Sequence, residues 1–207
     1  MKRLLAFALA TNSNCIDIGA HEGTILREIL RCSPNGRHIA YEPLPGFYQR
    51  LVRVFPQVDI RHAALSNEAG ECQFKYVKSR PGYSGFRERS YPGIEEIETI
   101  TVRTERLDDS LPPGYVPAFI KIDVEGAERL VFEGAIETIT RAKPIIVFEH
   151  GRGAAEHYQT RPEQIFDLLS RRAGLRIFDL DGNGAYSEAQ FVGTFDRGER
   201  WNFVAHR

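Results

Sequence analysis

Short apolar runs that favour β-strand alternate with segments of helical periodicity along most of the chain. The first run, Asn14–Ala20, ends in a glycine turn, and apolar residues recur at helical spacing in the next segment, Glu22–Cys32. The other predicted strands are Arg37–Tyr41, Val58–Ala63, Ala118–Asp123, Pro144–Glu149, Leu175–Leu180 and Trp201–His206, and the other helices are Pro45–Phe55, Ala127–Arg141 and Pro162–Ala173. Short strands separated by helices predict an α/β fold: a mostly parallel, doubly wound sheet with helices on both faces.

Residues 71–106 interrupt this alternation. Cys72–Val77 and Thr99–Arg103 have the composition of strands, and they flank a long loop, Lys78–Gly93. We interpret the segment as a β-hairpin and loop inserted between the third and fourth strands. Long loops in small domains are often functional. The loop is therefore a candidate lid over an acceptor. The alternative is a mobile, solvent-exposed loop that binds no ligand.

The length and composition fit one globular domain that spans residues 1–207. Of the 207 residues, 42% are hydrophobic and 27% are charged. The 27 lysines and arginines nearly balance the 28 acids, which leaves a net charge of -1. A chain with this balance has no general attraction to nucleic acid or to an acidic membrane. We expect neither as a partner.

The cysteines and the first residues predict a cytoplasmic setting. Cys15, Cys32 and Cys72 are an odd number without the close pairs of a zinc site or a disulfide framework. Met1–Ala10 has a charged start and a short apolar stretch, which we interpret as a first helix rather than a secretory signal, because the first strand follows within a few residues. No other stretch approaches the roughly 20 apolar residues of a membrane span.

The turn after the first strand is a candidate nucleotide site. Small residues at Gly19, Ala20 and Gly23 allow a sharp turn and a close approach of the backbone to a ligand at the start of a helix. Doubly wound proteins also use such turns for packing alone. The pattern Gly-x-Gly-x-x-Gly is absent, and Asp17 stands at the place of its first glycine, which disfavours a pyrophosphate. S-adenosylmethionine (SAM) carries an ammonium and a sulfonium instead of phosphates, so an acid here favours SAM over a dinucleotide.

Two further acids stand at predicted strand ends. Glu42 follows the second strand about 20 residues beyond the turn, where a carboxylate can accept hydrogen bonds from both ribose hydroxyls; a solvated surface glutamate is the alternative. Asp123 ends the strand that should lie beside the first one at the topological switch point, so we expect it to face the cofactor or the acceptor. Capping of the next helix is the alternative for Asp123, although Glu125 and Glu128 suit that role better.

These residues resemble the FkbM family of SAM-dependent methyltransferases. The matching motifs run roughly from Asn14 to His150, and the third one is the most specific: Asp17–Ala20, Glu42–Pro43, Lys121–Glu128, Phe132–Ala135 and Pro144–His150. The resemblance implies a seven-stranded, Rossmann-like class I methyltransferase domain. It also implies O-methylation of a hydroxyl on a sugar or natural product, with SAM as cofactor.

The resemblance assigns cofactor roles to matching positions. Asp17, Gly19 and Gly23 would surround the methionine portion, with Asp123 near its end, and Glu42 would bind the ribose. The remaining expected cofactor contacts are the turn residues Ala20 and His21, and Ala64 near the adenine. His21 and Glu22 stand where the family often has asparagine and an apolar residue, and relatives often carry more sequence before Asp17.

Methyl transfer to a hydroxyl needs alignment and a base or a metal. His150 is the candidate base because it directly follows a strand and histidine titrates near neutral pH; a histidine hydrogen-bonded in the sheet rim is the alternative. We expect Asp123 to be the second catalytic residue. Asp123 and Glu149 end neighbouring strands and could hold Mg²⁺, but two carboxylates do not establish a metal site, and we favour a reaction without metal.

The candidate acceptor contacts are aromatic and cationic. Tyr83 and Arg87 lie in the loop over residues 78–93, and Arg152 follows the strand that ends at Glu149. An aromatic ring could stack on the acceptor, and an arginine could hold an anionic group. A small-molecule acceptor is therefore expected.

Three other functions compete with this interpretation. A methyltransferase acting on a macromolecule is disfavoured by the balanced charge and by the absence of an Asn-Pro-Pro-Tyr-like motif. A non-catalytic nucleotide-binding module of the same fold is disfavoured by the intact acids Asp17, Glu42 and Asp123. A Rossmann oxidoreductase is disfavoured by the missing glycine pattern.

Overall fold

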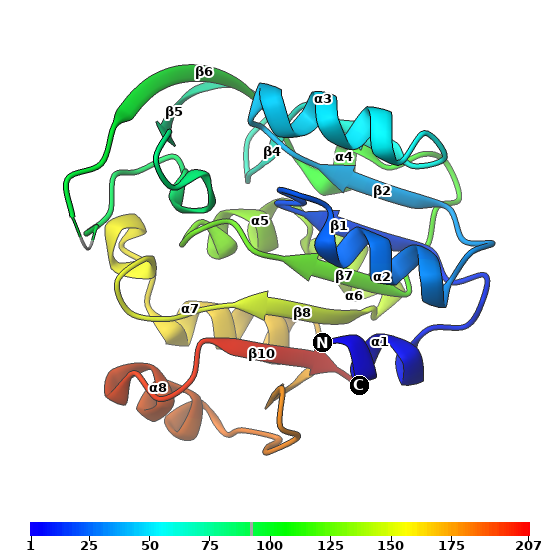
Figure 1. Cartoon of the computed structure of the whole chain (residues 1–207). Helices are drawn as coiled ribbons and strands as arrows, with labels where there is room; N and C mark the ends of the chain where they lie inside the picture. The colour runs from blue at the N-terminus through cyan, green and yellow to red at the C-terminus, as the bar shows by residue number, and fades with distance from the viewer. Residues whose placement is uncertain (92) are drawn as a thin grey trace.

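The computed structural model describes residues 1–91 and 93–207, and its main feature is a seven-stranded sheet (Figure 1). In spatial order the strands are β3 (Asp59–Arg61), β2 (His38–Tyr41), β1 (Cys15–Ile18), β7 (Phe119–Ile122), β8 (Ile145–Glu149), β10 (Asn202–His206) and β9 (Arg176–Asp179). The neighbouring strands from β3 to β8 pair in parallel, whereas β10 is antiparallel to both of its neighbours. The predicted mostly parallel α/β fold is confirmed.

Helices cover both faces of this sheet (Figure 1). One face carries α1 (Lys2–Ala8), α2 (Thr24–Cys32) and α3 (Pro45–Val54). The other carries α4 (Leu107–Ser110), α5 (Glu128–Gly134), α6 (Ile136–Ala142), α7 (Pro162–Phe166), a π-helical continuation η3 (Asp167–Arg172), and α8 (Glu188–Arg197). Because strand side chains alternate between faces, Ile16 and Ile18 pack in the core beneath the second group, whereas Cys15 packs beneath the first.

Two helical segments differ from the sequence prediction. The predicted helix Ala127–Arg141 is divided into α5 and α6, and α5 ends at Gly134, where an added Cβ would lie 2.0 Å from the carbonyl oxygen of Ser66. The helix α8 was not predicted, although Ser187 and Gln190 form a capping box and Gly198 ends the helix at φ 63°. Its Phe191 packs into the main core.

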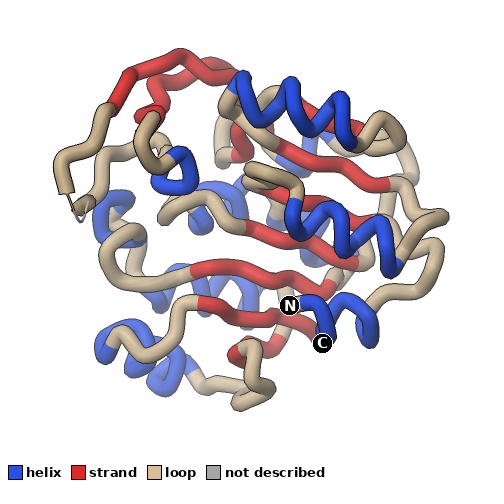
Figure 2. The backbone as a smooth tube through the Cα atoms, in the orientation of Figure 1, coloured by secondary structure: helices blue, strands red, loops and turns tan. Residues whose placement is uncertain are grey.

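The inserted segment pairs with β4 in a second, three-stranded sheet. Its order is β4 (Ala64–Leu65), β6 (Ile97–Glu105) and β5 (Gly70–Val77), and β5 and β6 make the predicted antiparallel hairpin. The connecting loop contains a 3₁₀ turn, η1 (Pro81–Tyr83), and Pro92 of this predicted lid lies outside the described residues. Figure 2 shows the insertion beside the end of the main sheet where β7 and β8 finish. A second 3₁₀ turn, η2 (Ala155–Tyr158), follows β8.

Among the described residues, no helix combines the length and the apolar character that a membrane crossing needs.

Candidate active site

The carboxyl ends of β1 and β7 converge at a glycine that no other residue could replace without movement. Gly19 has φ +73°, and a Cβ at this position would lie 2.0 Å from the carbonyl oxygen of Asp123. The amide of Asp123 donates to the carbonyl of Ile18 at 3.2 Å, which extends the pairing of the two strands by one bond. The chain leaves β1 toward β2 on one side, while β7 lies on the other, so this is the switch point of the sheet.

Gly23 and Ala20 shape the turn through packing. Gly23 is the N-cap of α2 with φ +75°, and an added Cβ would approach the ring of Phe55 to 2.5 Å. Ala20 is buried in the apolar cluster that also contains Phe55 and Leu51. Neither residue lines the pocket at the switch point, so their predicted contacts with a cofactor find no direct support in the geometry.

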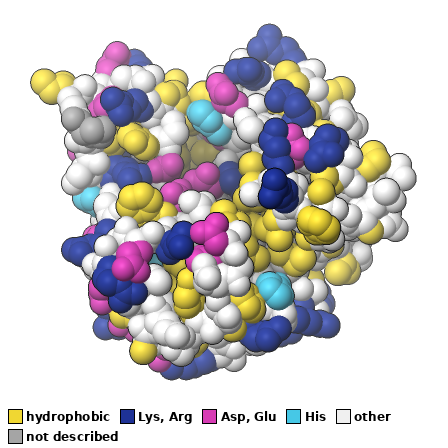
Figure 3. Space-filling model, turned by 60° about the horizontal axis from the view of Figure 1, so that its bottom comes forward, with side chains coloured by type: hydrophobic (Ala, Val, Ile, Leu, Met, Phe, Trp, Pro, Cys, Tyr) yellow, Lys and Arg dark blue, Asp and Glu magenta, His cyan; other side chains and the backbone are white. Residues whose placement is uncertain are grey.

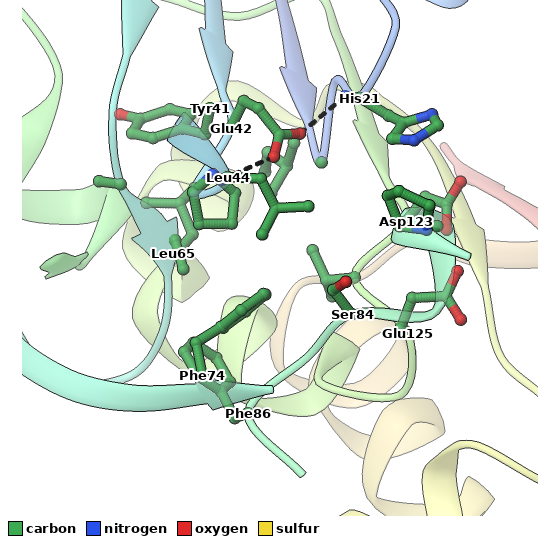
Figure 4. Close-up of a pocket in the computed structure, with 18 residues that line it drawn as sticks. His21, Tyr41, Glu42, Leu44, Leu65, Phe74, Ser84, Phe86, Asp123 and Glu125 are labelled. Carbon is green, nitrogen blue, oxygen red and sulfur yellow. Dashed lines mark hydrogen bonds between the residues drawn. The ribbon is translucent and has the colours of Figure 1, made fainter. Parts of the chain in front are cut away.

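A pocket of about 720 Å³, including its open mouth, lies at the switch point (Figure 4). One part is apolar and is lined by side chains from the β3–β4 connection, β4, β5 and the inserted loop: Ala63, Ala64, Leu65, Phe74 and Phe86. Figure 4 shows Glu42 and Asp123 on different sides of the same space. The pocket therefore offers an apolar region and separate acidic groups to one ligand.

Glu42 is anchored by two backbone amides. Its Oε2 accepts from the amide of His21 and its Oε1 accepts from the amide of Leu44, both at 2.8 Å (Figure 4). The residue is 3% exposed, and burial raises its pKa to about 7, although the two amide bonds oppose the shift. A carboxylate oxygen can accept a second hydrogen bond. Glu42 is thus oriented to accept from two adjacent hydroxyls in the pocket.

His21 lines the pocket as an aromatic group. Its backbone has φ +48°, and its ring lies against Phe47 with a centroid distance of 4.2 Å. Burial lowers the pKa of the imidazole, and Nε2 has no hydrogen-bond partner among residues 1–91 and 93–207. The neutral form of the ring is therefore favoured, and its Nε2 is buried without a hydrogen-bond partner among these residues.

Asp17 does not line the pocket, and it lies beneath the turn against Lys121. Its residue exposure is 1%, and Lys121 Nζ is 3.5 Å from Asp17 Oδ1 and 3.5 Å from Asp123 Oδ2. Nζ also donates to the carbonyl of Gly19 at 2.6 Å. Burial opposes the charge of Lys121, but the neighbouring Asp17 and Asp123 raise its pKa. The sequence motif contained Lys121, but no sequence signal identified it as the cation between the two acids.

A second pocket adjoins the first, and Glu125 lines both. Glu125 forms an ion pair with Arg89 of the inserted loop, and the Arg89 guanidinium lies 4.9 Å from the ring centroid of Tyr83. Trp201 and Glu149 lie on other parts of the wall. The loop therefore contributes a cation and an aromatic ring to a pocket whose remaining walls come from the strand ends.

Three carboxylates meet at the junction of the two pockets. One oxygen from each of Asp123, Glu125 and Glu149 lies within 4.8 Å of the others. Burial and the charge of Asp123 raise the pKa of Glu125 to about 8 and that of Glu149 to about 7. Figure 3 shows acidic side chains gathered in a hollow of the face that is viewed. These oxygens could hold a divalent cation, yet Arg89 and Lys121 already supply positive charge beside them.

The environment of His150 does not support the role of general base that the sequence predicts for it. The residue is 1% exposed, and its ring stacks on Phe195 at 4.9 Å and on Phe191 at 5.8 Å. Neither ring nitrogen has a hydrogen-bond partner in the part of the chain that the structure describes. Burial lowers the pKa to about 4. His150 lines the second pocket as a buried ring packed on α8, and the alternative of a histidine hydrogen-bonded in the sheet rim is not supported either.

The predicted acceptor residues fall in two places. Tyr83 and Arg152 line the second pocket, whereas Arg87 is exposed and lines a separate hollow beside Arg129. Arg89 lies beside Tyr83 in the second pocket, whereas the sequence analysis named Arg87 as the acceptor contact from this loop. Both arginines lie in one loop without regular structure, so no periodicity indicated which of them faces the pocket.

The strand order, the glycine turn at the switch point and the acid after β2 together define a Rossmann-like fold of the methyltransferase class. The model of the methyltransferase FkbM domain matches residues 17–177. The chain therefore belongs to the FkbM methyltransferase family, as the sequence motifs predicted.

Solved methyltransferase structures share this fold at low sequence identity. A methyltransferase FkbM from Methylobacillus flagellatus KT is 16% identical with a TM-score of 0.61, and the match covers 96% of this chain and 44% of that one. The chain thus spans less than half of that protein's length. An O-methyltransferase from Bacillus cereus in complex with SAH is 13% identical, with coverages of 99% and 77% and a TM-score of 0.55.

A TehB-like SAM-dependent methyltransferase from Corynebacterium glutamicum is 11% identical, with coverages of 99% and 84% and a TM-score of 0.52. No curated protein sequence matches the chain.

Proposed function

We propose that this protein is a SAM-dependent methyltransferase that methylates a hydroxyl of a small molecule. The observation that carries the proposal is the arrangement of one pocket at the switch point, in which an apolar region, the anchored Glu42 and the acidic Asp123 face the same space. SAM presents an adenine, a ribose diol and a cationic methionine end. These three parts match the three regions of the pocket.

The match gives an orientation for the cofactor. Leu65, Phe74 and Phe86 surround the adenine, with Ala64 beside them, and Glu42 accepts hydrogen bonds from the ribose. The methionine end then lies toward Asp123, near the Gly19 turn. SAH, which the Bacillus cereus O-methyltransferase binds, has the same adenosine.

The second pocket is the proposed acceptor site because it opens beside Asp123 and shares Glu125 with the first. Tyr83 and Trp201 supply aromatic surfaces, and Arg89 and Arg152 supply donors. Hydroxyl-rich rings bind well to such a mixture of aromatic faces and charged hydrogen-bonding groups. A sugar or a hydroxylated natural product fits this site.

Methyl transfer breaks the bond between sulfur and the methyl carbon and forms a bond between that carbon and the acceptor oxygen. The hydroxyl proton must move to a base. Glu149 is the proposed base, because it lies at the junction of the two pockets and its pKa is raised to about 7 by burial and by Asp123. A carboxylate with this pKa is ionised above neutral pH and is a stronger base than an exposed one.

Binding and turnover test the proposal separately. Isothermal titration of the purified protein should show binding of SAM and SAH and no binding of NAD. Glu42→Gln should weaken the binding of SAM and of SAH. Glu22→Gln is the matched control, because Glu22 stands in the same turn but its side chain is 53% exposed. Labelled methyl donor and a panel of hydroxylated sugars and natural products then test transfer. Binding of NAD in place of SAM would contradict the proposal.

A further inference from the structure

A buried lysine joins two carboxylates with very different surroundings. Lys121 has a side chain that is 9% exposed, and its Nζ lies 3.5 Å from an oxygen of Asp17 and 3.5 Å from an oxygen of Asp123. The Asp123 side chain is 42% exposed and lines the proposed cofactor pocket, whereas Asp17 is 1% exposed and does not line it. Water can therefore stabilise the charge of Asp123 but not that of Asp17.

The hydrogen bonds of this cluster also indicate that the charge of Asp17 depends on Lys121. Neither oxygen of Asp17 has a hydrogen-bond partner within the described residues, so its ion pair with Lys121 is the contact that offsets its burial. Lys121 uses its donors on the carbonyls of Gly19 at 2.6 Å and Ile18 at 3.4 Å. These two bonds hold its ammonium group at the end of β1, at the same distance of 3.5 Å from both carboxylates.

Charge balance follows from this geometry. One lysine charge and two carboxylate charges leave the cluster with a net charge of about -1 when all three groups are ionised. Because Asp17 depends on Lys121, the uncompensated charge belongs to Asp123, the carboxylate that reaches the pocket. Without Asp17, Lys121 would neutralise Asp123 instead.

We propose that Asp17 is a positioning residue that acts through Lys121, balancing the lysine charge so that Asp123 keeps a negative charge toward the cofactor. This inference rests on the proposed function, since the charge that Asp123 would face is the sulfonium of SAM. SAH lacks that positive charge but shares the adenosine and the amino acid group. The cluster therefore sets the preference of the protein for SAM over SAH.

The test is the ratio of the dissociation constants for SAM and SAH, measured by isothermal titration at low ionic strength. In Asp17→Asn, Lys121 is free to neutralise Asp123, so SAM affinity should fall about fivefold more than SAH affinity. Glu42→Gln acts on the ribose that both ligands share, so it should weaken both equally. If Asp17→Asn changes the two affinities by the same factor, or changes neither, the inference is wrong.

The double variant Asp17→Asn with Lys121→Met tests the inference if the single variant does not fold. It removes both buried charges together and leaves Asp123 uncompensated, so the ratio should stay within about twofold of the unchanged protein. If SAM binding instead becomes about fivefold stronger relative to SAH binding, Lys121 had been neutralising Asp123, which overturns the inference. If the unchanged protein binds neither ligand, the proposed function itself is wrong, and the inference falls with it.

Discussion

The carboxylate of Glu42 accepts a hydrogen bond from the backbone amide of His21 at 2.8 Å, which joins the end of β2 to the turn after β1. Glu42→Ala removes this bond, the bond from Leu44 and the proposed ribose contacts. We expect SAM and SAH affinities to fall at least about tenfold, because each hydrogen bond to a charged group is worth about 1.5–3 kcal/mol. Isothermal titration measures the loss, and Glu22→Ala should leave both affinities unchanged.

Gly19→Ala should destabilise the fold by about 3 kcal/mol or more. The new Cβ would lie 2.0 Å from the Asp123 carbonyl oxygen, and the backbone at φ +73° disfavours any side chain. Urea unfolding measures the change in the free energy of unfolding. Gly46→Ala in α3 is the matched control, because a Cβ there meets no heavy atom within 4 Å; it should be neutral or stabilising by up to about 1 kcal/mol.

Glu149→Gln should lower the rate of methyl transfer about 100-fold or more, the usual contribution of a general base. The affinity for SAM should change by less than about threefold, since Glu149 does not line the first pocket. In the unchanged protein the rate should rise with pH and level off above an apparent pKa near 7, the value to which burial and Asp123 raise Glu149. A rate that is independent of pH between about 6 and 8 would assign the base elsewhere.

Glu128 should make stability depend on pH. The residue is 2% exposed, and burial raises its pKa from 4.5 to about 8, although the amide of Gly126 donates to it at 3.1 Å. A carboxyl with a raised pKa binds its proton more tightly in the folded state. Its contribution to stability is therefore complete below pH 4.5 and is lost as the pH rises toward about 8.

Glu128→Gln removes that titration. The melting temperature of the variant relative to the unchanged protein should rise by about 3 °C or more between pH 5 and pH 9, measured by differential scanning calorimetry. Glu137→Gln, on the exposed part of α6, is the control and should show no such trend. A constant difference between Glu128→Gln and the unchanged protein would show that Glu128 has an ordinary pKa in the fold.

Removal of divalent cations should leave methyl transfer unchanged. Asp123, Glu125 and Glu149 lie close enough to hold an ion, but Arg89 already forms an ion pair with Glu125. The guanidinium charge reduces the repulsion between the three carboxylates, which a metal ion would otherwise have to offset. Activity assays with and without EDTA, followed by addition of Mg²⁺, test this. A loss in EDTA that Mg²⁺ restores would assign the three acids to a metal site.

The sequence was sufficient for the fold and for two acids of the site. Alternating strands and helices require a parallel sheet, and the carboxyl ends of parallel strands meet at one edge. Glu42 and Asp123 stand directly after strands, so their place beside the pocket followed from their positions in the chain. The family motifs were short-range patterns of the same kind, and the match over residues 17–177 confirmed them.

The helices show where local patterns were not enough. Residues 127–141 have helical composition throughout, but Gly134 meets the Ser66 carbonyl across the fold, and the helix is divided there. That contact joins residues 68 positions apart. Periodicity reports only neighbours within a few turns, so it could not predict the break.

Only the tertiary structure decided which charged side chains share a space. Asp17 stands in a strand and His150 follows one, and both positions suggested ligand contacts, yet Asp17 is buried against Lys121 and His150 against two phenylalanine rings of α8. Arg89, rather than Arg87, reaches Glu125 from a loop without regular structure. Hydrophobic periodicity determines on which face of a strand or helix a residue lies, and that much is written in the sequence. Burial, pKa and ion pairing depend on what other segments bring to the same point, and long-range packing alone determines that.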